Sequence, residues 1–411
     1  MKRPLDVHKY GGSSVGTPDR LLRVARRVAV AARDRELVVV VSAMGDTTDE
    51  LLALAASVTA GAAPDRRELD ALLATGENQS AALLAMALCA MDTPAVSLSG
   101  SQAGVAATGP HGKARIAGID PARLRDELAK GRVVVVAGFQ GETDGGEVAT
   151  LGRGGSDTSA VALAAALRAD RCVIYTDVRG VYTTDPRVVP SARQLPVIGY
   201  EEMLELAHHG AQVMQPRAVE LGWVNDIVIE VASSLEEAPG TEIREEHTME
   251  QRNKVRGIAI DRGIVKVTLV AVADRPGIAA TVFGTLAEAA VNVDLIVQNT
   301  GRDGATDLSF AIGAADLPQA RPVVEAIAAS LGAAGVSFDE SLAKVSIVGS
   351  GIANAPGYAA RMFRVLADAG VNIAMIATSE IRITAVVPAA SADEAARALH
   401  TAFELDAPAA A

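Results

Sequence analysis

Three segments of this sequence combine glycines with charged and hydroxyl side chains, a composition typical of sites that bind phosphate groups or other anions. The first is Lys9-Tyr-Gly-Gly-Ser-Ser14, which follows a short apolar run. Paired glycines let backbone N–H groups approach an anion closely, hydroxyls add donors, and the lysine supplies a full charge. The spacing differs from the Walker P-loop, in which the lysine follows the glycines. A tight turn without a ligand would use the same residue types, so this segment alone leaves both interpretations open.

The second segment, from Thr150 to Thr158, reads TLGRGGSDT and leads into a predicted helix. Backbone N–H groups at a helix N-terminus attract anions, and the planar guanidinium of Arg153 can hold a carboxylate through two hydrogen bonds. Glycines, hydroxyls, Arg153 and Asp157 gathered at such a place predict a loop that binds an anionic substrate.

The third segment runs from Tyr175 to Arg187 and follows a predicted strand. Its aromatic, acidic and basic side chains suit the base, ribose and phosphates of a nucleotide, although two surface turns would explain the same residues. Ser42, at the end of another predicted strand, and Thr75-Gly-Glu77, which we expect to open a helix, complete the rim of the site. Glu77 taken alone also has the explanation of a solvated acid at a helix N-terminus.

The elements that must position these residues are alternating strands and helices. Val-rich runs predict strands buried on both faces, and they lie at 37–42, 133–138 and 171–176. Amphipathic or Ala-rich stretches predict helices between them, at 18–33, 49–58, 77–91 and 157–167. This alternation indicates an α/β fold with a layered, largely parallel sheet, whose ligands bind at the carboxyl ends of the strands.

Composition and charge exclude several classes of protein. The chain has 411 residues with a net charge of −12, whereas a general nucleic-acid binder would carry a basic face. The six histidines are scattered and meet no cysteine pair at zinc-ligand spacing. We find no signal-peptide core at the beginning and no apolar stretch long enough to span a bilayer. Cys89 and Cys172 lie in apolar runs and are expected to be buried thiols, so we expect a cytoplasmic protein without membrane or nucleic-acid partners.

The last part of the chain contains an internal repeat. Beyond a polar stretch that includes Pro239-Gly240, residues 274–299 match residues 354–379 at 11 of 26 positions. Each copy follows a predicted strand and reads turn, helix, strand, which is about half of a small α+β sandwich. The predicted organisation is a catalytic domain at 1–235, a linker at 236–260, and two small domains at 261–340 and 341–411.

Taken in order, the motifs resemble the aspartate kinases of the amino-acid kinase superfamily. They are KYGGSS, VVSAMGDTTDELL, TGE, GFQG, TLGRGGSDTSA and YTDVRGVYTTDPR. The repeats, which begin DRPG and NAPG, resemble ACT domains, ferredoxin-like domains that bind amino-acid effectors. The resemblance implies transfer of the γ-phosphoryl group of ATP, bound with Mg²⁺, to the β-carboxylate of L-aspartate. The product, 4-phospho-L-aspartate, is the first intermediate in the biosynthesis of lysine, threonine, methionine and diaminopimelate.

A β-carboxylate is already an anion, so this reaction needs positioning and charge neutralisation rather than a strong general base. By resemblance, Lys9 neutralises charge on the transferred phosphoryl group, Asp157 organises Lys9, Arg153 holds the substrate α-carboxylate, and Glu77 pairs with the α-ammonium group. The substrate set that the resemblance implies is Ser42, Thr48, Glu77, Arg153, Gly154, Gly155 and Ser156. The nucleotide set that it implies, without any metal-binding residue, is Lys9, Gly11, Gly12, Ser13, Ser42, Ser156, Thr176, Asp177, Tyr182, Asp185, Arg187 and Gln212.

This chain departs from many relatives at Gln212, where they carry a lysine. Glutamine can donate a hydrogen bond but brings no charge, so we expect weaker nucleotide binding than a lysine would give.

The resemblance also implies feedback inhibition by lysine, threonine or both, at sites formed between ACT domains of paired chains. The candidate effector residues are Asp274, Gly277, Ala279, Asn292, Val293, Asp294 and Gln298 in the first repeat and Tyr358, Ala359, Asn372, Ile373, Ser379 and Glu380 in the second. Three carboxylates could meet a cationic amino acid or be ordinary solvated acids, namely Asp274, Asp294 and Glu380. We expect a homo-oligomer formed through the ACT domains, and an internal start at Met249 would add a short subunit in an α2β2 assembly.

Two alternative functions remain. The first is another amino-acid kinase, acting on glutamate or acetylglutamate, against which the tandem repeats and the TGE motif argue. The second is an amino-acid sensor whose kinase half has lost activity, but a decayed site has no reason to keep Lys9, Glu77, Arg153 and Asp157 together.

Overall fold

The computed structural model describes residues 3–211, 213–245, 255–298, 304–352 and 356–407. The chain forms two compact units, each of which is described separately. The first comprises Met1–Tyr182, Gln194–Ala207 and Gln212–Glu250. The second comprises Thr183–Arg193, His208–Ala211 and Gln251–Ala411.

The first unit is built on an eight-stranded sheet with the strand order β10-β12-β11-β9-β1-β2-β6-β3. Its strands are β1 Leu5–Tyr10, β2 Glu36–Val41, β3 Ala95–Leu98, β6 Val133–Ala137, β9 Arg171–Thr176, β10 Val197–Ile198, β11 Ile229–Ser233 and β12 Thr241–Ile243. All neighbouring strands run parallel except β11 and β12. The carboxyl ends of β1, β2, β6 and β9 therefore lie along one edge, as the sequence predicts for the site.

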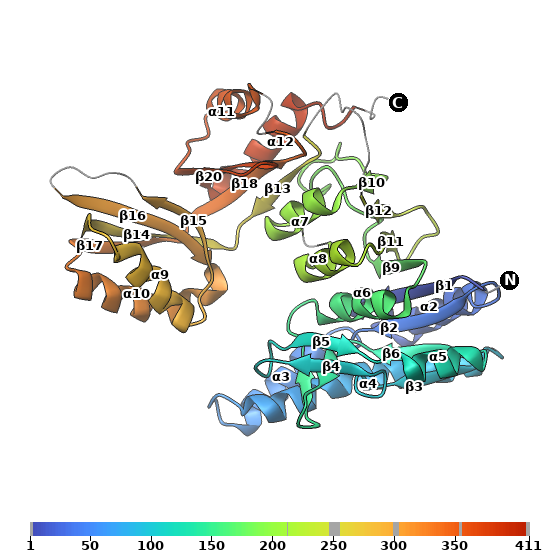
Figure 1. Ribbon diagram of the computed structural model, residues 1–411. Coiled ribbons are helices and arrows are strands. Elements are labelled where there is room, and N and C mark those ends of the chain that lie inside the picture. The colour runs from blue at the N-terminus through green and yellow to red at the C-terminus, as the bar shows by residue number, and fades with distance from the viewer. Residues whose placement is uncertain (1–2, 212, 246–254, 299–303, 353–355, 408–411) are drawn as a thin grey trace. The chain divides into compact units, whose positions relative to one another are not determined.

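Helices cover both faces of this sheet (Figure 1). On one face, α2 Pro18–Ala31 and α4 Arg66–Cys89 share a core with Val39 and Val41. On the other, α6 Gly155–Leu167 packs against β1, β2 and β9. Successive side chains of a strand point to opposite faces, and β2 is buried along almost its whole length. The Val-rich runs are thus strands buried on both faces, which confirms that prediction.

The first unit contains a further sheet and further helices. A second, four-stranded sheet has the order β5-β4-β7-β8, with β4 Val105–Thr108, β5 Arg115–Ile119, β7 Gln140–Glu142 and β8 Val148–Thr150. Strand β7 follows β6 directly, and β8 leads into the loop before α6. The other helices are α1 Gly12–Val15, α3 Thr47–Val58, α5 Ala122–Ala129, α7 Tyr200–His208 and α8 Pro216–Val224.

Two local predictions were wrong in this unit. Helix α4 begins at Arg66, where Asp65 accepts the backbone N–H groups of Arg67 and Glu68, so Glu77 lies in mid-helix rather than at a helix start. The sequence misled because Thr75-Gly76 looks like a helix boundary, whereas Gly76 continues the helix. Cys172 is buried as expected, but Cys89, at the end of α4, is exposed.

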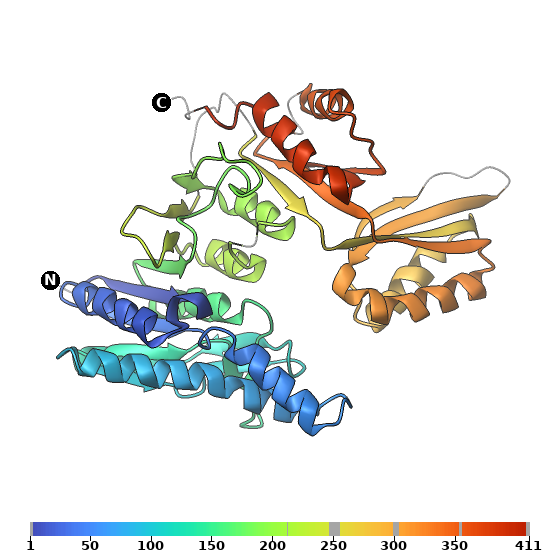
Figure 2. The ribbon, with the colours of Figure 1, turned by 180° about the vertical axis from the view of Figure 1, so that it is seen from behind.

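The second unit contains two similar four-stranded antiparallel sheets, which confirms the internal repeat. The first repeat consists of β14 Ile264–Ala273, α9 Ile278–Glu288, β15 Val293–Gln298, β16 Ala305–Gly313, a 3-10 turn η1 Ala314–Asp316, α10 Leu317–Leu331 and β17 Gly335–Asp339. The second consists of β18 Leu342–Val348, α11 Tyr358–Asp368, β19 Met375–Thr378, β20 Arg382–Pro388, a 3-10 turn η2 Ala389–Ser391 and α12 Ala392–Ala402. In each repeat the two helices cover one face of the sheet (Figures 1 and 2).

The fourth strand of the second repeat comes from an earlier part of the chain. The sheets have the orders β15-β16-β14-β17 and β19-β20-β18-β13, so β13 Gly257–Asp261 takes the place that β17 holds in the first repeat. The segment predicted as a linker, 236–260, therefore contains β12 and most of β13. The short apolar run Gly-Ile-Ala-Ile at 257–260 follows a highly charged stretch, so the sequence pattern did not predict a strand there.

Part of the loop after β9 belongs to the second unit. The Thr183 carbonyl oxygen accepts a hydrogen bond from the Ile258 backbone N–H at 2.7 Å, and the Thr183 hydroxyl lies 2.9 Å from Nε2 of His400. Arg193 donates to the Leu405 carbonyl at 3.0 Å. These contacts attach residues 183–193 to β13, to α12 and to the segment after α12.

None of the helices in the described part of the chain has the length and apolar character that a membrane crossing requires.

Candidate active site

Lys9 and Asp157 form an ion pair at the carboxyl edge of the main sheet. Lys9 lies near the end of β1 and Asp157 in the first turn of α6, and the lysine Nζ is 2.6 Å from the aspartate Oδ1. Both side chains are largely buried, with 12% and 11% exposure. The first and second predicted segments, far apart in sequence, therefore meet at this pair.

The backbone after β1 packs tightly against the backbone after β2. A Cβ atom on Gly12 would lie 2.8 Å from the Ala43 carbonyl oxygen, so a larger residue would separate the two loops. The Gly45 N–H donates to the Gly12 carbonyl, and the Ser42 N–H to the Tyr10 carbonyl. Gly11 thus caps the short helix α1, which Gly12 and Ser13 begin, beside Ser42.

The loop before α6 is shaped by glycines and leaves Arg153 exposed. Gly154 caps α6 with a left-handed φ of 68°, and a Cβ atom there would lie 1.7 Å from Cγ of Gln215. Gly155 and Ser156 begin the helix, and Ser156 packs against Gly138 at the end of β6. Backbone N–H groups and Arg153 are therefore presented together at a helix N-terminus, which favours an anionic ligand.

Glu77 is a buried carboxyl group on α4, with 4% exposure. Its Oε1 accepts the Ala43 backbone N–H at 3.0 Å, and its Oε2, within the described part of the chain, has no hydrogen-bond partner. Burial raises the pKa of Glu77 to about 7, although the Ala43 N–H opposes that rise. Gly76 allows this approach, because a Cβ atom there would meet Ala43 and Thr47. Thr48, half-buried, follows in α3.

The predicted nucleotide residues fall into both units. Thr176 ends β9 and Asp177 follows it, and the Thr176 hydroxyl donates to the Asp177 carboxylate. Tyr175 stacks on Tyr10 with 4.7 Å between ring centroids and packs against the core, whereas Tyr182 follows in the loop after β9 and is half-buried.

Asp185 and Arg187 belong to the second unit and pair with each other at 2.8 Å. The hydrogen bonds from Arg187 lower the pKa of the Asp185 carboxyl group, although burial opposes them. Gln212 lies outside the described residues.

The candidate effector residues of the first repeat lie at two ends of its sheet. Asp274, Gly277 and Ala279 surround the start of α9, whereas Asn292, Val293 and Asp294 open β15 at the opposite end. The registers of β14, β15 and β16 pair Val293 with Ile312, which in turn faces Val265 at the beginning of β14. Gln298, at the far end of β15, lies nearer the first group. One chain therefore does not bring the whole set together.

Asp294 is engaged by a lysine of the same chain. Lys344, on β18 and only 6% exposed at its side chain, lies 3.0 Å from Asp294 and 3.0 Å from Asp261. Burial alone would raise the pKa of Asp294, but the Lys344 ammonium group and the Leu295 N–H hold it below its usual range. A cationic effector would therefore have to compete with Lys344 for the Asp294 carboxylate.

The second repeat has a similar arrangement. Tyr358 and Ala359 begin α11, and Gly357 before them has a φ of 106° that matches the 98° of Gly277. Asn372 and Ile373 precede β19, whereas Ser379 and Glu380 follow it. Tyr358 stacks on Phe403 at 6.0 Å, so its ring is held against α12 rather than pointing freely to solvent.

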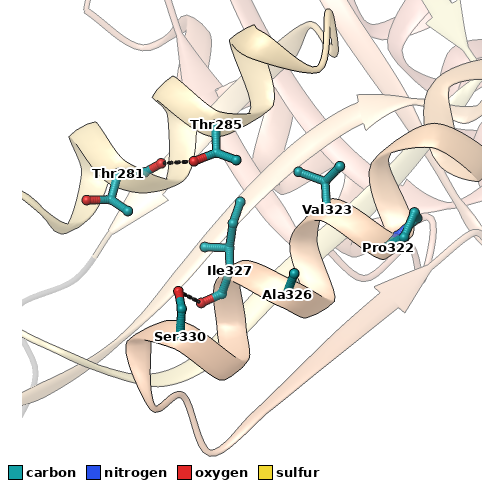
Figure 3. Close-up of a pocket in the computed structure, with 7 residues that line it drawn as sticks. All are labelled: Thr281, Thr285, Pro322, Val323, Ala326, Ile327 and Ser330. Carbon is teal, nitrogen blue, oxygen red and sulfur yellow. Dashed lines mark hydrogen bonds between the residues drawn. The ribbon is translucent and has the colours of Figure 1, made fainter.

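A separate cavity of about 490 Å³ lies between α9 and α10 (Figure 3). Its lining is apolar or hydroxylic and carries no charge, with residues Thr281, Thr285, Pro322, Val323, Ala326, Ile327 and Ser330. The two threonine hydroxyls and the Ser330 hydroxyl bond to backbone carbonyls of their own helices. An amino acid, with two opposite charges, has no complementary group in this cavity.

Several residues of the site were missed by the sequence reasoning. Ala43 contributes only its backbone, and Gly138 acts by allowing Ser156 to approach, so neither has a side-chain signal. Asp70 is a charged residue on the buried face of α4, seven positions before Glu77. A charge at an apolar-face position of a helix is a signal that the sequence does contain.

Comparison with known proteins assigns each unit. The amino acid kinase family model matches residues 5–233, and ACT domain models match residues 266–329 and 345–403. The fold and site therefore define an amino acid kinase followed by two ACT domains.

Close relatives make the assignment more specific. An aspartokinase of Geobacillus stearothermophilus is 50% identical over 400 residues, covering 97% of each chain. Aspartokinase 2 of Bacillus subtilis is 48% identical over 402 residues, covering 98% of each chain. E. coli aspartokinase III, solved with aspartate and ADP, matches with a TM-score of 0.83 and 28% identity, covering 97% of this chain and 99% of the other. This chain belongs to the aspartokinases.

Proposed function

We propose that this protein transfers the γ-phosphoryl group of ATP to the β-carboxylate of L-aspartate. A carboxylate oxygen forms a bond to the γ-phosphorus, the bond from phosphorus to the β–γ bridging oxygen breaks, and ADP leaves. No proton must be removed from the attacking carboxylate, so the protein has to hold both anions together and neutralise their charge. The observation that carries the proposal is the Lys9–Asp157 pair, set between the glycine-rich loop after β1 and the Arg153 loop.

Each group has a distinct part in this reaction. Asp157 holds Lys9 at the carboxyl edge, where the ammonium group neutralises charge on the transferred phosphoryl group. Backbone N–H groups of Gly11 and Gly12 and the hydroxyls of Ser13, Ser42 and Ser156 donate to phosphate or substrate oxygens. Arg153 takes the α-carboxylate of aspartate, Glu77 takes its α-ammonium group, and Thr48 and the N–H groups of Gly154 and Gly155 line the same pocket. Thr176, Asp177, Tyr182, Asp185, Arg187 and Gln212 complete the nucleotide set.

Mg²⁺ enters with the nucleotide in this proposal. Among the residues that the structure describes, no group of three or more His, Cys, Asp or Glu side chains is arranged to hold a metal ion. Mg²⁺ commonly keeps most of its ligands from water and substrate phosphates, so a site with few protein carboxylates fits MgATP.

The ACT repeats make the enzyme subject to feedback in this proposal. E. coli aspartokinase III has also been solved with lysine and aspartate, and this chain matches that form with a TM-score of 0.76. We propose lysine, threonine or both as effectors and a homo-oligomer formed through the ACT domains, with cytoplasmic activity. A chain beginning at Met249, which lies outside the described residues, would be the second subunit of an α2β2 form.

The test is ATP-dependent acyl phosphate formation, trapped with hydroxylamine, using L-aspartate, L-glutamate and N-acetylglutamate, with and without lysine and threonine. Aspartate-specific turnover that an effector lowers is the expected result. Turnover with another acceptor would assign a different amino-acid kinase, and absence of turnover with effector binding intact would assign a sensor.

In the same assay, Arg153→Ala should raise the aspartate KM at least ~10-fold, because a charge-assisted bidentate contact is lost. Arg123→Ala removes another exposed arginine, on α5, and is the matched control. An unchanged aspartate KM in Arg153→Ala would remove Arg153 from the substrate pocket.

A further inference from the structure

A buried carboxylate next to the substrate loop has no part in the reaction described above. Asp70, on α4, is 1% exposed. Its Oδ2 accepts the backbone N–H groups of Gly112 and Thr150, both at 2.9 Å, and lies 3.0 Å from Nδ1 of His111. Its Oδ1 accepts the Thr150 hydroxyl at 2.6 Å. Four polar contacts, from two loops that are far apart in sequence, therefore converge on one carboxylate.

These contacts reach the loop that carries Arg153. Thr150 ends β8 and stands three residues before Arg153, and its carbonyl oxygen accepts the Ala114 N–H at 3.0 Å. A Cβ atom on Gly152 would lie 3.1 Å from the Gly112 carbonyl oxygen, so the loop packs directly on residues 111–114. Asp70 thus binds both segments that pack together here, the one at Gly112 and the one at Thr150.

Arg217, on α8, holds the next residue of the same loop. Its Nη1 donates to the Leu151 carbonyl oxygen at 2.7 Å, and its Nη2 donates to the Ala114 carbonyl oxygen at 3.3 Å. Asp70 therefore accepts hydrogen bonds from the N–H and hydroxyl groups of Thr150, and Arg217 donates one to the carbonyl oxygen of Leu151. Backbone fixed at both positions leaves little freedom for Gly152, the one residue that separates Leu151 from Arg153.

Helix α4 also carries Glu77, two turns after Asp70. In the proposed function, Glu77 receives the α-ammonium group of aspartate and Arg153 receives its α-carboxylate. One rigid helix then sets the distance between the two recognition groups, directly through Glu77 and indirectly through the loop bound to Asp70. A buried carboxylate costs free energy unless it is fully hydrogen-bonded, and an apolar residue would fill this place without that cost. Fixing the loop is a reason to keep the charge.

We propose that Asp70 and Arg217 are positioning residues that fix the backbone of residues 150–152 and thereby aim Arg153 at the substrate carboxylate. The proposal deepens the proposed function and rests on it for the identity of the substrate. It concerns the amino-acid end of the site, since Lys9 is held independently by Asp157 within α6.

The kinetic test is Asp70→Asn, in which an amide N–H₂ replaces one acceptor and faces N–H donors. The expected result is an aspartate KM raised at least ~10-fold with an ATP KM within about twofold of the wild type. Asp65→Asn is the matched control on the same helix, because asparagine caps a helix N-terminus as well as aspartate does. Arg217→Met should act in the same direction, and Arg217→Lys, which keeps a donor, should recover part of the loss.

A second measurement does not depend on activity. Trypsin cleaves after exposed arginines, and the Arg153–Gly154 bond should be cut several-fold faster in Asp70→Asn than in wild type once the loop is released. Thr150→Val, which removes only the hydroxyl donor, should give a smaller effect that disappears in the Asp70→Asn background. If Asp70→Asn folds poorly, Thr150→Val alone and Arg217→Met still test the proposal, because each removes one contact to the loop and leaves Asp70 in place.

The outcomes separate the two proposals. A wild-type enzyme without aspartate turnover contradicts the proposed function, and cleavage at Arg153 then still decides whether Asp70 anchors the loop. Equal rises in both KM values, or unchanged cleavage at Arg153, would assign Asp70 a general structural role and overturn the inference.

Discussion

Glu77 shows how much one buried side chain depends on its surroundings. Its carboxyl group accepts one backbone N–H and faces no cation within the described chain, so burial keeps its pKa near 7. The incoming α-ammonium group of a substrate would supply the missing charge and favour the ionised form. In the proposed function, substrate binding would therefore be coupled to loss of a proton from Glu77.

The kcat/KM for aspartate should rise from pH 6 to pH 8 with an apparent pKa near 7, because the ionised form of Glu77 binds the ammonium group. In Glu77→Gln it should be at least ~10-fold lower and nearly flat over that range.

The pH dependence of folding stability has the opposite sign to that of kcat/KM. Folding raises the pKa of the Glu77 carboxyl group, so the free energy of unfolding of the protein falls as the pH rises from the ordinary glutamate pKa to about 7. At pH 8, Glu77→Gln should therefore unfold at the same temperature as the wild type or at a higher one.

These measurements need MgATP held at saturation while aspartate is varied. A wild-type kcat/KM independent of pH between 6 and 8, or a Glu77→Gln variant with unchanged aspartate KM, would exclude the direct pairing.

At the scale of elements, β18 joins the two repeats. Ala343, Val345 and Ile347 face the core under α11 and α12, whereas Leu342 packs with Ile264 and Leu295 of the first repeat. Lys344 lies on this second face and binds one carboxylate from β13 and one from β15. Three strands from three parts of the chain therefore share one ammonium group.

Lys344→Met should destabilise a fragment of residues 255–407 by about 2 kcal/mol at pH 7, because two carboxylates lose their common cation, with solvent reducing the cost at half-exposed Asp294. Lys344 lowers the pKa of Asp294, so its contribution is present above the ordinary aspartate pKa and is lost as the pH falls through the folded value. The difference between variant and wild type, measured by urea unfolding, should be nearly constant from pH 7 to about pH 4 and should shrink at lower pH, where Asp294 becomes protonated.

Lys266→Met is the matched control, because Lys266 stands at the equivalent place of the first repeat, in KVTLVA against KVSIVG, and is half-exposed. Equal losses in the two variants would contradict a special role for the Lys344 pairs.

Much of this architecture was predictable, because it rests on patterns that are local in sequence. Buried Val-rich runs predicted the strands, the amphipathic stretch at 18–33 predicted α2, and the matching turns DRPG and NAPG preceded α9 and α11. The start of α4 was missed because Gly76 is tolerated inside the helix to admit Ala43. The engagement of Asp294 by Lys344 depends on how two sheets pack, which no local pattern contains.

At the scale of the whole molecule, the second repeat is completed by a strand that precedes the first. Residues 341–407 expressed alone would expose the edge of β18 that β13 normally covers, and exposed edges pair with other chains. We expect this fragment to aggregate, whereas residues 255–407 should be monodisperse and unfold in one cooperative transition, as gel filtration and calorimetry would show. A monomeric, folded fragment of 341–407 would show that β13 is dispensable.

The early position of β13 also limits where translation of a separate regulatory polypeptide can begin. A separate regulatory polypeptide translated from within this reading frame keeps both sheets complete only if its initiation codon lies upstream of Gly257. Between the end of β12 at Ile243 and Gly257 the sequence contains a single methionine, Met249. Translation beginning at any later methionine, the next being Met362, would leave neither repeat whole. The same rule applies to recombination, since exchange of a regulatory half between related genes would have to join before this strand and not between the repeats.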